Sequence, residues 1–228
     1  MNKILWKPKI SKKSHVSNFI DELNRKNNLQ IDKYEELYKW SISNPKQFWE
    51  ETWKYSNIIS SSQYHEIVDD ITKMPGAEWF SGAKLNFAEN LLRFRDDRPA
   101  IHYKNENSKI KTITYKSLYR SVEALSFSLR SIGVKKGDRV AGYISNIPEA
   151  IIAMLASSSI GAIWSSTSPD FGVNGVLDRF SQIQPKVLFA TSGYSYNGKY
   201  YDSLENVHDI TRKIKCLIKV VIINQRKE

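Results

Sequence analysis

Short apolar runs alternate with longer amphipathic segments from about residue 100 onward, and this alternation constrains the fold more than any other feature. The runs at residues 139–144, 187–191 and 217–223 are rich in Val, Ile, Leu and Ala, which is typical of buried strands. Apolar side chains at helical spacing lie between these runs and also before the first of them, where Thr114 is the N-cap of a helix and Gly133 its stop. Strands that alternate with helices pair in parallel. The sequence therefore predicts an α/β fold.

The first hundred residues predict mainly helix instead. Apolar side chains recur at helical spacing between residues 16 and 53 and again over residues 84–95. We also expect a turn at residues 74–76 and short strands at residues 100–103 and 110–114. The chain ends five residues after its last expected strand, without a following crossover. The expected architecture is an amino-terminal helical segment followed by the first, incomplete part of a layered parallel-sheet domain.

Composition excludes several classes of protein. The single cysteine, Cys216, cannot form an internal disulfide, which favours a reducing compartment. The longest apolar stretch, residues 150–164, contains three serines and is shorter than the roughly 20 residues of a membrane helix. The first residues hold no apolar run typical of a secretory signal. We expect a cytoplasmic protein that does not bind membranes.

The net charge of +10 suggests a nucleic-acid partner, so the position of the charge matters. The whole excess lies in residues 1–13 and 212–228, and the part between them is neutral. A nucleic-acid-binding protein usually concentrates its basic residues on one face of the fold. We therefore expect no nucleic-acid partner.

No complete active site is visible in the residues themselves. The four histidines are far apart and do not have metal-ligand spacing, and no glycine-rich phosphate loop is present. We predict no catalytic residue and no metal ligand. The most site-like segment is residues 165–172. It follows an expected strand at residues 161–165 and lies at the edge where open α/β sheets bind ligands. Serine, proline and glycine also make ordinary turns, so a simple turn stays an alternative there.

Several motifs resemble one enzyme family. WFSGAKLNFAEN at residues 79–90, GVKKGDRV at 133–140 and NIPEA at 146–150 are similar to the acetyl-CoA synthetase-like, AMP-forming acyl-activating enzymes. WSSTSPDFG at residues 164–172 and YNGK at 196–199 resemble the acetoacetyl-CoA synthetase (acetoacetate–CoA ligase) branch of that family. The resemblance covers roughly residues 35–224.

The resemblance implies a ligase that uses ATP, CoA and Mg²⁺. In this family a carboxylate and ATP give an acyl-adenylate and diphosphate, and the CoA thiol then displaces AMP. The phosphate loop and the catalytic lysine come later in the family's sequences. The resemblance therefore implies the amino-terminal portion of a ligase that is inactive alone and binds none of these molecules tightly. The implied partners are acetoacetate, ATP, CoA and the remainder of the ligase chain.

The resemblance also implies residues that contact CoA. Ser168, Pro169 and Asp170 match the loop that borders the channel for the pantetheine arm. Ser195, Gly198 and Lys199 match a segment where family arginines meet the CoA phosphates. The arginines are absent here, and Lys199 offers only a point charge in their place.

The implied organisation has three parts. These are a basic extension over residues 1–30, an acetyl-CoA synthetase-like helical region over 31–95, and the first part of an adenylation domain over 96–228. Two alternatives stay open: a fragment of another short-chain acyl-CoA synthetase, and a non-catalytic module that binds CoA or a partner chain through its open sheet edge.

Overall fold

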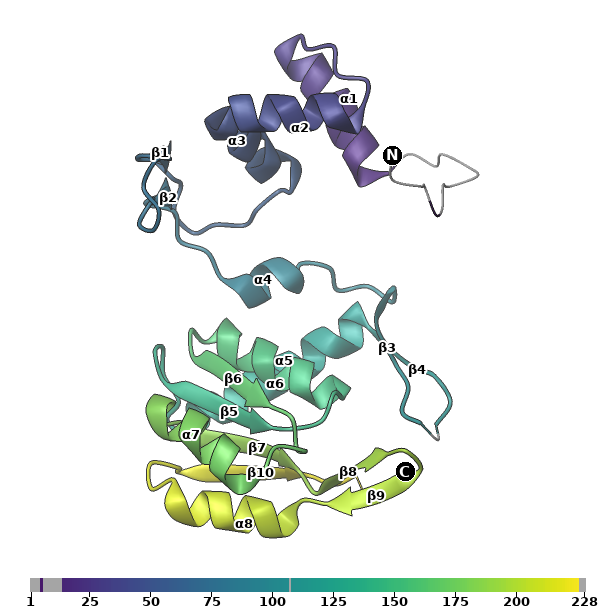
Figure 1. The fold of residues 1–228 in the computed structure, drawn as a ribbon, viewed down its shortest axis with the longest axis vertical. Helices are drawn as coiled ribbons and strands as arrows, with labels where there is room; N and C mark the ends of the chain where they lie inside the picture. The colour runs from purple at the N-terminus through teal and green to yellow at the C-terminus, as the bar shows by residue number, and fades with distance from the viewer. Residues whose placement is uncertain (1–4, 6–13, 107, 226–228) are drawn as a thin grey trace. The chain divides into compact units, whose positions relative to one another are not determined.

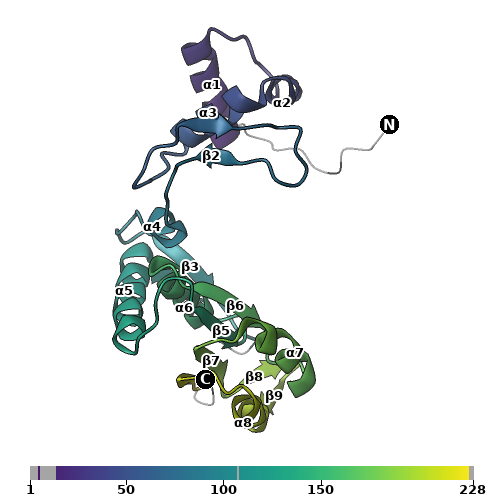
Figure 2. The ribbon, with the colours of Figure 1, turned by 90° about the vertical axis from the view of Figure 1, so that its left-hand side faces the viewer.

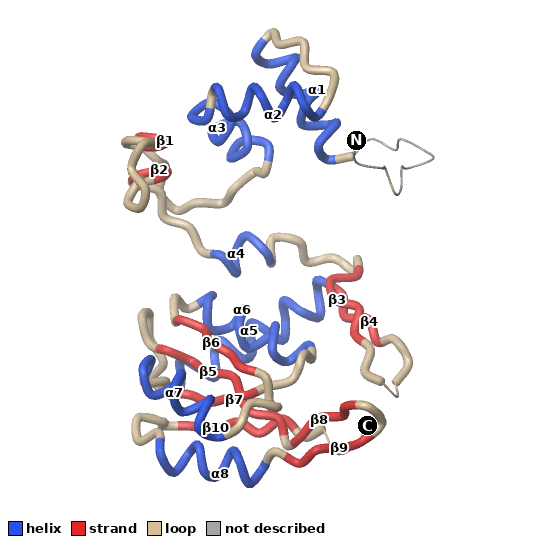
Figure 3. The backbone as a smooth tube through the Cα atoms, viewed as in Figure 1, coloured by secondary structure: helices blue, strands red, loops and turns tan. Residues whose placement is uncertain are grey.

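The computed structural model describes residues 5, 14–106 and 108–225. The chain divides into two compact units, Met1–Lys84 and Leu85–Glu228. Figures 1 and 3 show mainly helices in the first unit, and a sheet covered by helices in the second. Among the described residues, no helix is both long and apolar enough to cross a bilayer.

The first unit is built on three helices with a small shared core. Phe19, Leu23, Ile31 and Leu37 are buried together, and Ser14 caps the first helix through the Ser17 amide. The helices are α1 (His15–Asn27), α2 (Tyr34–Ser43) and α3 (Pro45–Tyr55). They confirm the helical prediction over residues 16–53.

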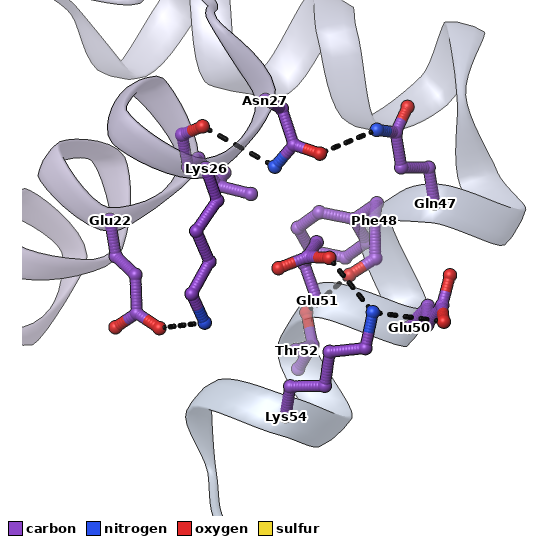
Figure 4. A network of polar contacts seen from close by, with 10 residues as sticks. Glu22, Lys26, Asn27, Gln47, Phe48, Glu50, Glu51, Thr52 and Lys54 are labelled. Carbon is purple, nitrogen blue, oxygen red and sulfur yellow. Dashed lines mark hydrogen bonds and ion pairs between the residues drawn. The ribbon is translucent and has the colours of Figure 1, made fainter.

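Outside this core, a polar contact joins α1 to α3, and ion pairs form within α3 (Figure 4). The Gln47 side chain on α3 donates a hydrogen bond to Asn27 at the end of α1, at 3.0 Å. Lys54 pairs with Glu50 at 2.9 Å and with Glu51 at 3.1 Å. The mainly buried Glu51 thus has a cationic partner, which offsets the cost of taking its charge out of water.

A short hairpin completes the first unit and was not predicted. β1 (Glu66–Val68) pairs antiparallel with β2 (Trp79–Ser81), and the predicted turn at residues 74–76 lies in the segment between them. The Trp53 ring of α3 lies 4.6 Å from the Phe80 ring between centroids. Each strand has only three residues, too few for a period-2 pattern to stand out.

The second unit contains the predicted parallel sheet. Its strand order is β10-β7-β5-β6, so β10 and β6 are the edge strands. The strands are β5 (Arg139–Tyr143), β6 (Ile163–Thr167), β7 (Val187–Thr191) and β10 (Lys219–Ile223). The fold class, α/β with amino-terminal helices and a parallel sheet, is confirmed.

Helices cover both faces of this sheet (Figure 2). One core holds Val140 and Phe189 against α5 and α6, and the other holds Leu188 and Ala190 against α7 and α8. The helices are α5 (Tyr115–Ser131), α6 (Pro148–Ser159), α7 (Val173–Ile183) and α8 (Leu204–Lys213). Thr114 caps α5 through the Ser117 amide, and Gly133 has φ 87° just beyond its end, as the sequence predicted.

The remaining elements differ more from the prediction. Only α4 (Phe87–Leu91) forms within residues 84–95, because the Lys84 backbone pairs with Ser62 and the Asn86 side chain starts the helix by accepting from Glu89. Two antiparallel hairpins are also present. They are β3 (Pro99–Tyr103) with β4 (Lys111–Thr114), which was predicted, and β8 (Gly193–Tyr196) with β9 (Lys199–Asp202), which was not.

Candidate functional site

The candidate site lies at the carboxyl edge of the parallel sheet. Tyr143, at the end of β5, is in register with Thr167 of β6 and with Ala190 of β7. The loop of residues 168–172 follows β6, and the β8–β9 hairpin follows β7, so parallel pairing brings both segments to one edge. β6 extends two residues further than the expected strand at 161–165. The first three residues of the predicted loop at 165–172 therefore belong to the strand.

A buried tyrosine holds the loop. The Tyr143 hydroxyl lies 2.6 Å from the Pro169 carbonyl oxygen and 2.9 Å from that of Phe171, so both carbonyls share its proton. The Asn206 amide of α8 donates to the same hydroxyl at 3.4 Å. Burial is the main cause that raises the pKa of Tyr143, which keeps the phenol protonated and able to donate.

The three predicted loop residues have different surroundings. Pro169 is buried beside Tyr143, whereas Ser168 and Asp170 are exposed. The pKa of Tyr194 on β8 is raised by burial and, to a smaller extent, by the negative charge of Asp170. The Asp170 carboxylate is therefore close enough to the hairpin for its charge to act there.

The hairpin turns sharply at Asn197 and Gly198. Their φ angles are 53° and 72°, the left-handed values of a two-residue turn that matches the strand twist. Tyr194 and Tyr201 stack across the strands with ring centroids 5.3 Å apart. A Cβ on Gly193 would lie 2.3 Å from the Tyr201 carbonyl oxygen, so the start of the hairpin requires glycine.

Strand register separates two of the predicted CoA residues. Ser195 is opposite Tyr200, and Lys199 is opposite Tyr196. Directly opposed residues share a face and successive residues alternate, so the Ser195 and Lys199 side chains lie on opposite faces of the hairpin. Both residues are exposed. A single ligand group on one face of the hairpin can contact only one of these two side chains.

A cleft of about 290 Å³ lies beside the hairpin. Its walls include Ser195 and Tyr194 from β8 and Lys104 and Glu106 from the β3–β4 loop. The other lining residues are Tyr103, Asn105, Ser145, Asn146, Ile147 and Gln225. Of the six predicted residues, only Ser195 lines this cleft.

Glu106, a further residue at the site, is not predicted by the sequence. Glu106 accepts hydrogen bonds from the Asn197 amide at 2.8 Å and the Gly198 amide at 2.9 Å, one on each carboxylate oxygen. These two bonds hold the pKa of Glu106 below its usual range. Its partners lie more than 90 positions away along the chain, so no local sequence signal reveals the contact.

The part of the chain that the structure describes offers no group of three or more His, Cys, Asp or Glu side chains that suits a metal ion. The prediction that the chain holds no catalytic residue stays a prediction. The site consists of polar and backbone groups arranged around a loop and a hairpin.

Comparison with known proteins places the chain in a family. Residues 87–228, more than half of the chain, match the family described as AMP-binding enzyme. The chain belongs to the AMP-binding enzyme family. Residues 34–91 match a second family, described as acetyl-coenzyme A synthetase N-terminus. The family resemblance seen in the sequence is confirmed, and the chain corresponds to the amino-terminal part of acetoacetyl-CoA synthetases.

Individual relatives agree with this assignment. Acetoacetyl-CoA synthetase of Macaca fascicularis is 44% identical over 225 residues, which cover 96% of this chain and 33% of that protein. A malonamoyl-CoA synthetase of Penicillium aethiopicum is 38% identical over 96% of this chain and 31% of its own length. The solved acetoacetyl-CoA synthetase of Streptomyces lividans superposes with a TM-score of 0.88 at 37% identity, over 93% of this chain and 33% of that one. The chain thus spans about a third of the length of these relatives.

Proposed function

We propose that this chain forms the amino-terminal part of an acetoacetate–CoA ligase, which converts acetoacetate, ATP and CoA to acetoacetyl-CoA, AMP and diphosphate. The observation that carries the proposal is the 44% identity to an acetoacetyl-CoA synthetase over almost the whole chain. The sheet edge adds physical support, since its loop and hairpin lie where α/β folds bind ligands. We propose that this protein acts in the cytoplasm.

We assign the CoA arm to the loop of residues 168–172. Ser168, Pro169 and Asp170 would border the pantetheine chain. Tyr143 fixes two carbonyls of this loop from within the core, so the loop offers a preformed wall. A wall that does not need to be ordered on binding costs less conformational entropy. CoA itself supplies the thiol that accepts the acyl group.

We assign a CoA phosphate to the β8–β9 hairpin. The exposed Lys199 ammonium would attract the phosphate as a point charge, without the two-pronged geometry of an arginine. Ser195, on the opposite face of the hairpin, would contact another part of CoA, and Gly198 would contribute through the shape of the turn. The Gly198 amide already donates to Glu106, so it is not available to a phosphate in this arrangement.

We assign no adenylation step to the residues described here. The sequence contains no glycine-rich phosphate loop, and the relatives that it matches are about three times as long. We therefore propose that the 228-residue chain alone does not form acyl-adenylate. The domain boundaries at residues 30 and 95 remain part of this proposal.

The malonamoyl-CoA synthetase relative supports a second candidate, a ligase for another short carboxylic acid. An assay of the complete ligase that contains this chain distinguishes the two candidate functions by their preferred acid. Acetoacetate should support CoA-dependent AMP release at a kcat/KM at least about tenfold above that for acetate, propionate or malonamate. A higher kcat/KM for any of those acids than for acetoacetate would show that acid to be the substrate instead. Exchange of labelled diphosphate into ATP by the 228-residue chain alone would contradict the proposed inactivity.

A further inference from the structure

The tip of the β8–β9 hairpin is joined to a distant part of the chain by Glu106. Asn197 and Gly198 are the two loop residues of the hairpin, and the strand pairing on either side of them ends at Tyr196 and Lys199. In a two-residue hairpin loop the amides at these positions have no ladder partner. Here each amide donates to one oxygen of the Glu106 carboxylate, at 2.8 and 2.9 Å.

Packing alone does not fix this tip. β9 is exposed along its whole length, and Tyr196, Asn197 and Gly198 are exposed as well. At its base the hairpin is tied to the sheet by the Ser203 amide, which donates to the Ser192 carbonyl at 2.9 Å. An exposed two-stranded ribbon held at its base is marginally stable and bends freely. The charge-assisted bonds to Glu106 supply a second point of attachment.

The contact also bridges two walls of the 290 Å³ cleft. Glu106 and Lys104 come from the β3–β4 loop on one wall, and Tyr194 and Ser195 come from β8 on the other. The distance between the walls therefore depends on whether Glu106 holds the tip. Lys199 follows Gly198 directly; it lies on the face opposite Ser195 and does not line the cleft, but its position depends on the same tip.

We propose that Glu106 is a positioning residue for CoA: by binding the Asn197 and Gly198 amides it fixes the tip of the hairpin and places Lys199, on the face away from the cleft, against a CoA phosphate. This inference rests on the proposed function. Glu106 touches neither CoA nor the reacting atoms in this scheme, and acts only through the hairpin. Its removal should weaken CoA binding and leave the ATP and acetoacetate steps unaffected.

The first test isolates the contact in the 228-residue chain. Glu106→Gln keeps the size of the side chain but replaces one acceptor oxygen with a donor group. Because Glu106 is exposed, the substitution should leave the fold intact. We expect hydrogen exchange at the Asn197 and Gly198 amides to quicken about tenfold or more, with the strand amides of β7 unchanged. Glu35→Gln, an exposed glutamate of α2 with the same change in charge, should leave both amides as they were. Equal exchange in Glu106→Gln and the parent chain would overturn the proposal.

The second test uses steady-state kinetics of the complete ligase that contains this chain. Glu106→Gln should raise the KM for CoA by up to about threefold, the effect expected for Lys199→Glu, with kcat and the KM for ATP unchanged, and Glu106→Asp should recover part of the loss. An unchanged KM for CoA in an active enzyme overturns the role of Glu106 and leaves the proposed function standing. A parent ligase with no CoA-dependent activity overturns both, even where the exchange test succeeds.

Discussion

Residues 168–172 and the tip of the β8–β9 hairpin share the carboxyl edge of the sheet but are held by opposite chemistry. A buried phenol, Tyr143, donates to two backbone carbonyls of the loop. An exposed carboxylate, Glu106, accepts from two backbone amides of the hairpin. The loop is thereby coupled to the core, whereas the hairpin depends on a contact that water and ions can reach. The two segments should therefore respond differently to mutation and to pH.

The largest effect is expected from Tyr143→Phe. Removing the hydroxyl leaves the Pro169 and Phe171 carbonyls without their donor at a mostly buried site, which costs about 2 kcal/mol of unfolding free energy. Urea denaturation should show this loss, and hydrogen exchange should show a mobile loop beside an unchanged hairpin. Tyr201→Phe, on the exposed β9, should change stability by less than about 0.5 kcal/mol. Equal losses in both variants would mean that Tyr143 does not hold the loop.

Gly193→Ala should destabilise the β8–β9 hairpin and leave the loop of residues 168–172 unchanged. Its new Cβ would lie 2.3 Å from a backbone oxygen of β9, so the two strands must separate at the start of the hairpin. We expect a loss of about 1 kcal/mol, since an exposed hairpin relieves most of the clash by opening. Amide exchange should quicken across β8 and β9 while residues 168–172 keep their protection. Gly172→Ala, where a Cβ meets nothing within 4 Å, is the matched control, and strand exchange as slow as in that control would contradict the packing argument.

Acid should release the hairpin and spare the loop. The amide bonds hold the pKa of Glu106 below its usual range, so the contact is fully present above that range and is lost as the pH falls through the lowered value. Burial raises the pKa of Tyr143, so its hydroxyl stays protonated throughout the same titration. NMR of the Asn197 and Gly198 amides between pH 7 and pH 3 should report the release. Amide shifts that stay constant while Glu106 titrates would refute it.

The smallest effect is expected from Lys199. In the complete ligase, Lys199→Glu should raise the KM for CoA about threefold, because a single exposed charge contributes little in water. Lys199→Arg should keep or lower that KM, since a guanidinium adds two-pronged phosphate geometry. A KM for CoA that is the same in both variants and in the parent would remove Lys199 from the proposed site.

Local signals in the sequence predicted much of the fold. The β-branched and apolar run at Val187–Thr191 predicted β7 to the residue, and Thr114 and Gly133 predicted both ends of α5. The short hairpins were harder. Asn197-Gly198 is a pair typical of a tight turn, but the flanking four-residue strands are rich in exposed tyrosine and lack a clear alternation.

The contacts that organise the site could not be predicted in the same way. Tyr143 reaches carbonyls 26 and 28 positions away, and Glu106 reaches amides 91 and 92 positions away. The Tyr143 bonds depend on how parallel strands bring their loops to one edge, and the Glu106 bonds depend on how two separate antiparallel hairpins meet. Spacing along the chain encodes neither. The register that separates Ser195 from Lys199 likewise became visible only with the hairpin.

We propose that these residues form the front part of an acetoacetate–CoA ligase. The most direct test of this proposal is to isolate the native polypeptide from cells with an antibody raised against this chain, and to measure its size and its AMP release. We expect a polypeptide about three times the 26.3 kDa of this chain, with AMP release that requires both acetoacetate and CoA. A native polypeptide of 26.3 kDa without that activity would contradict the proposal.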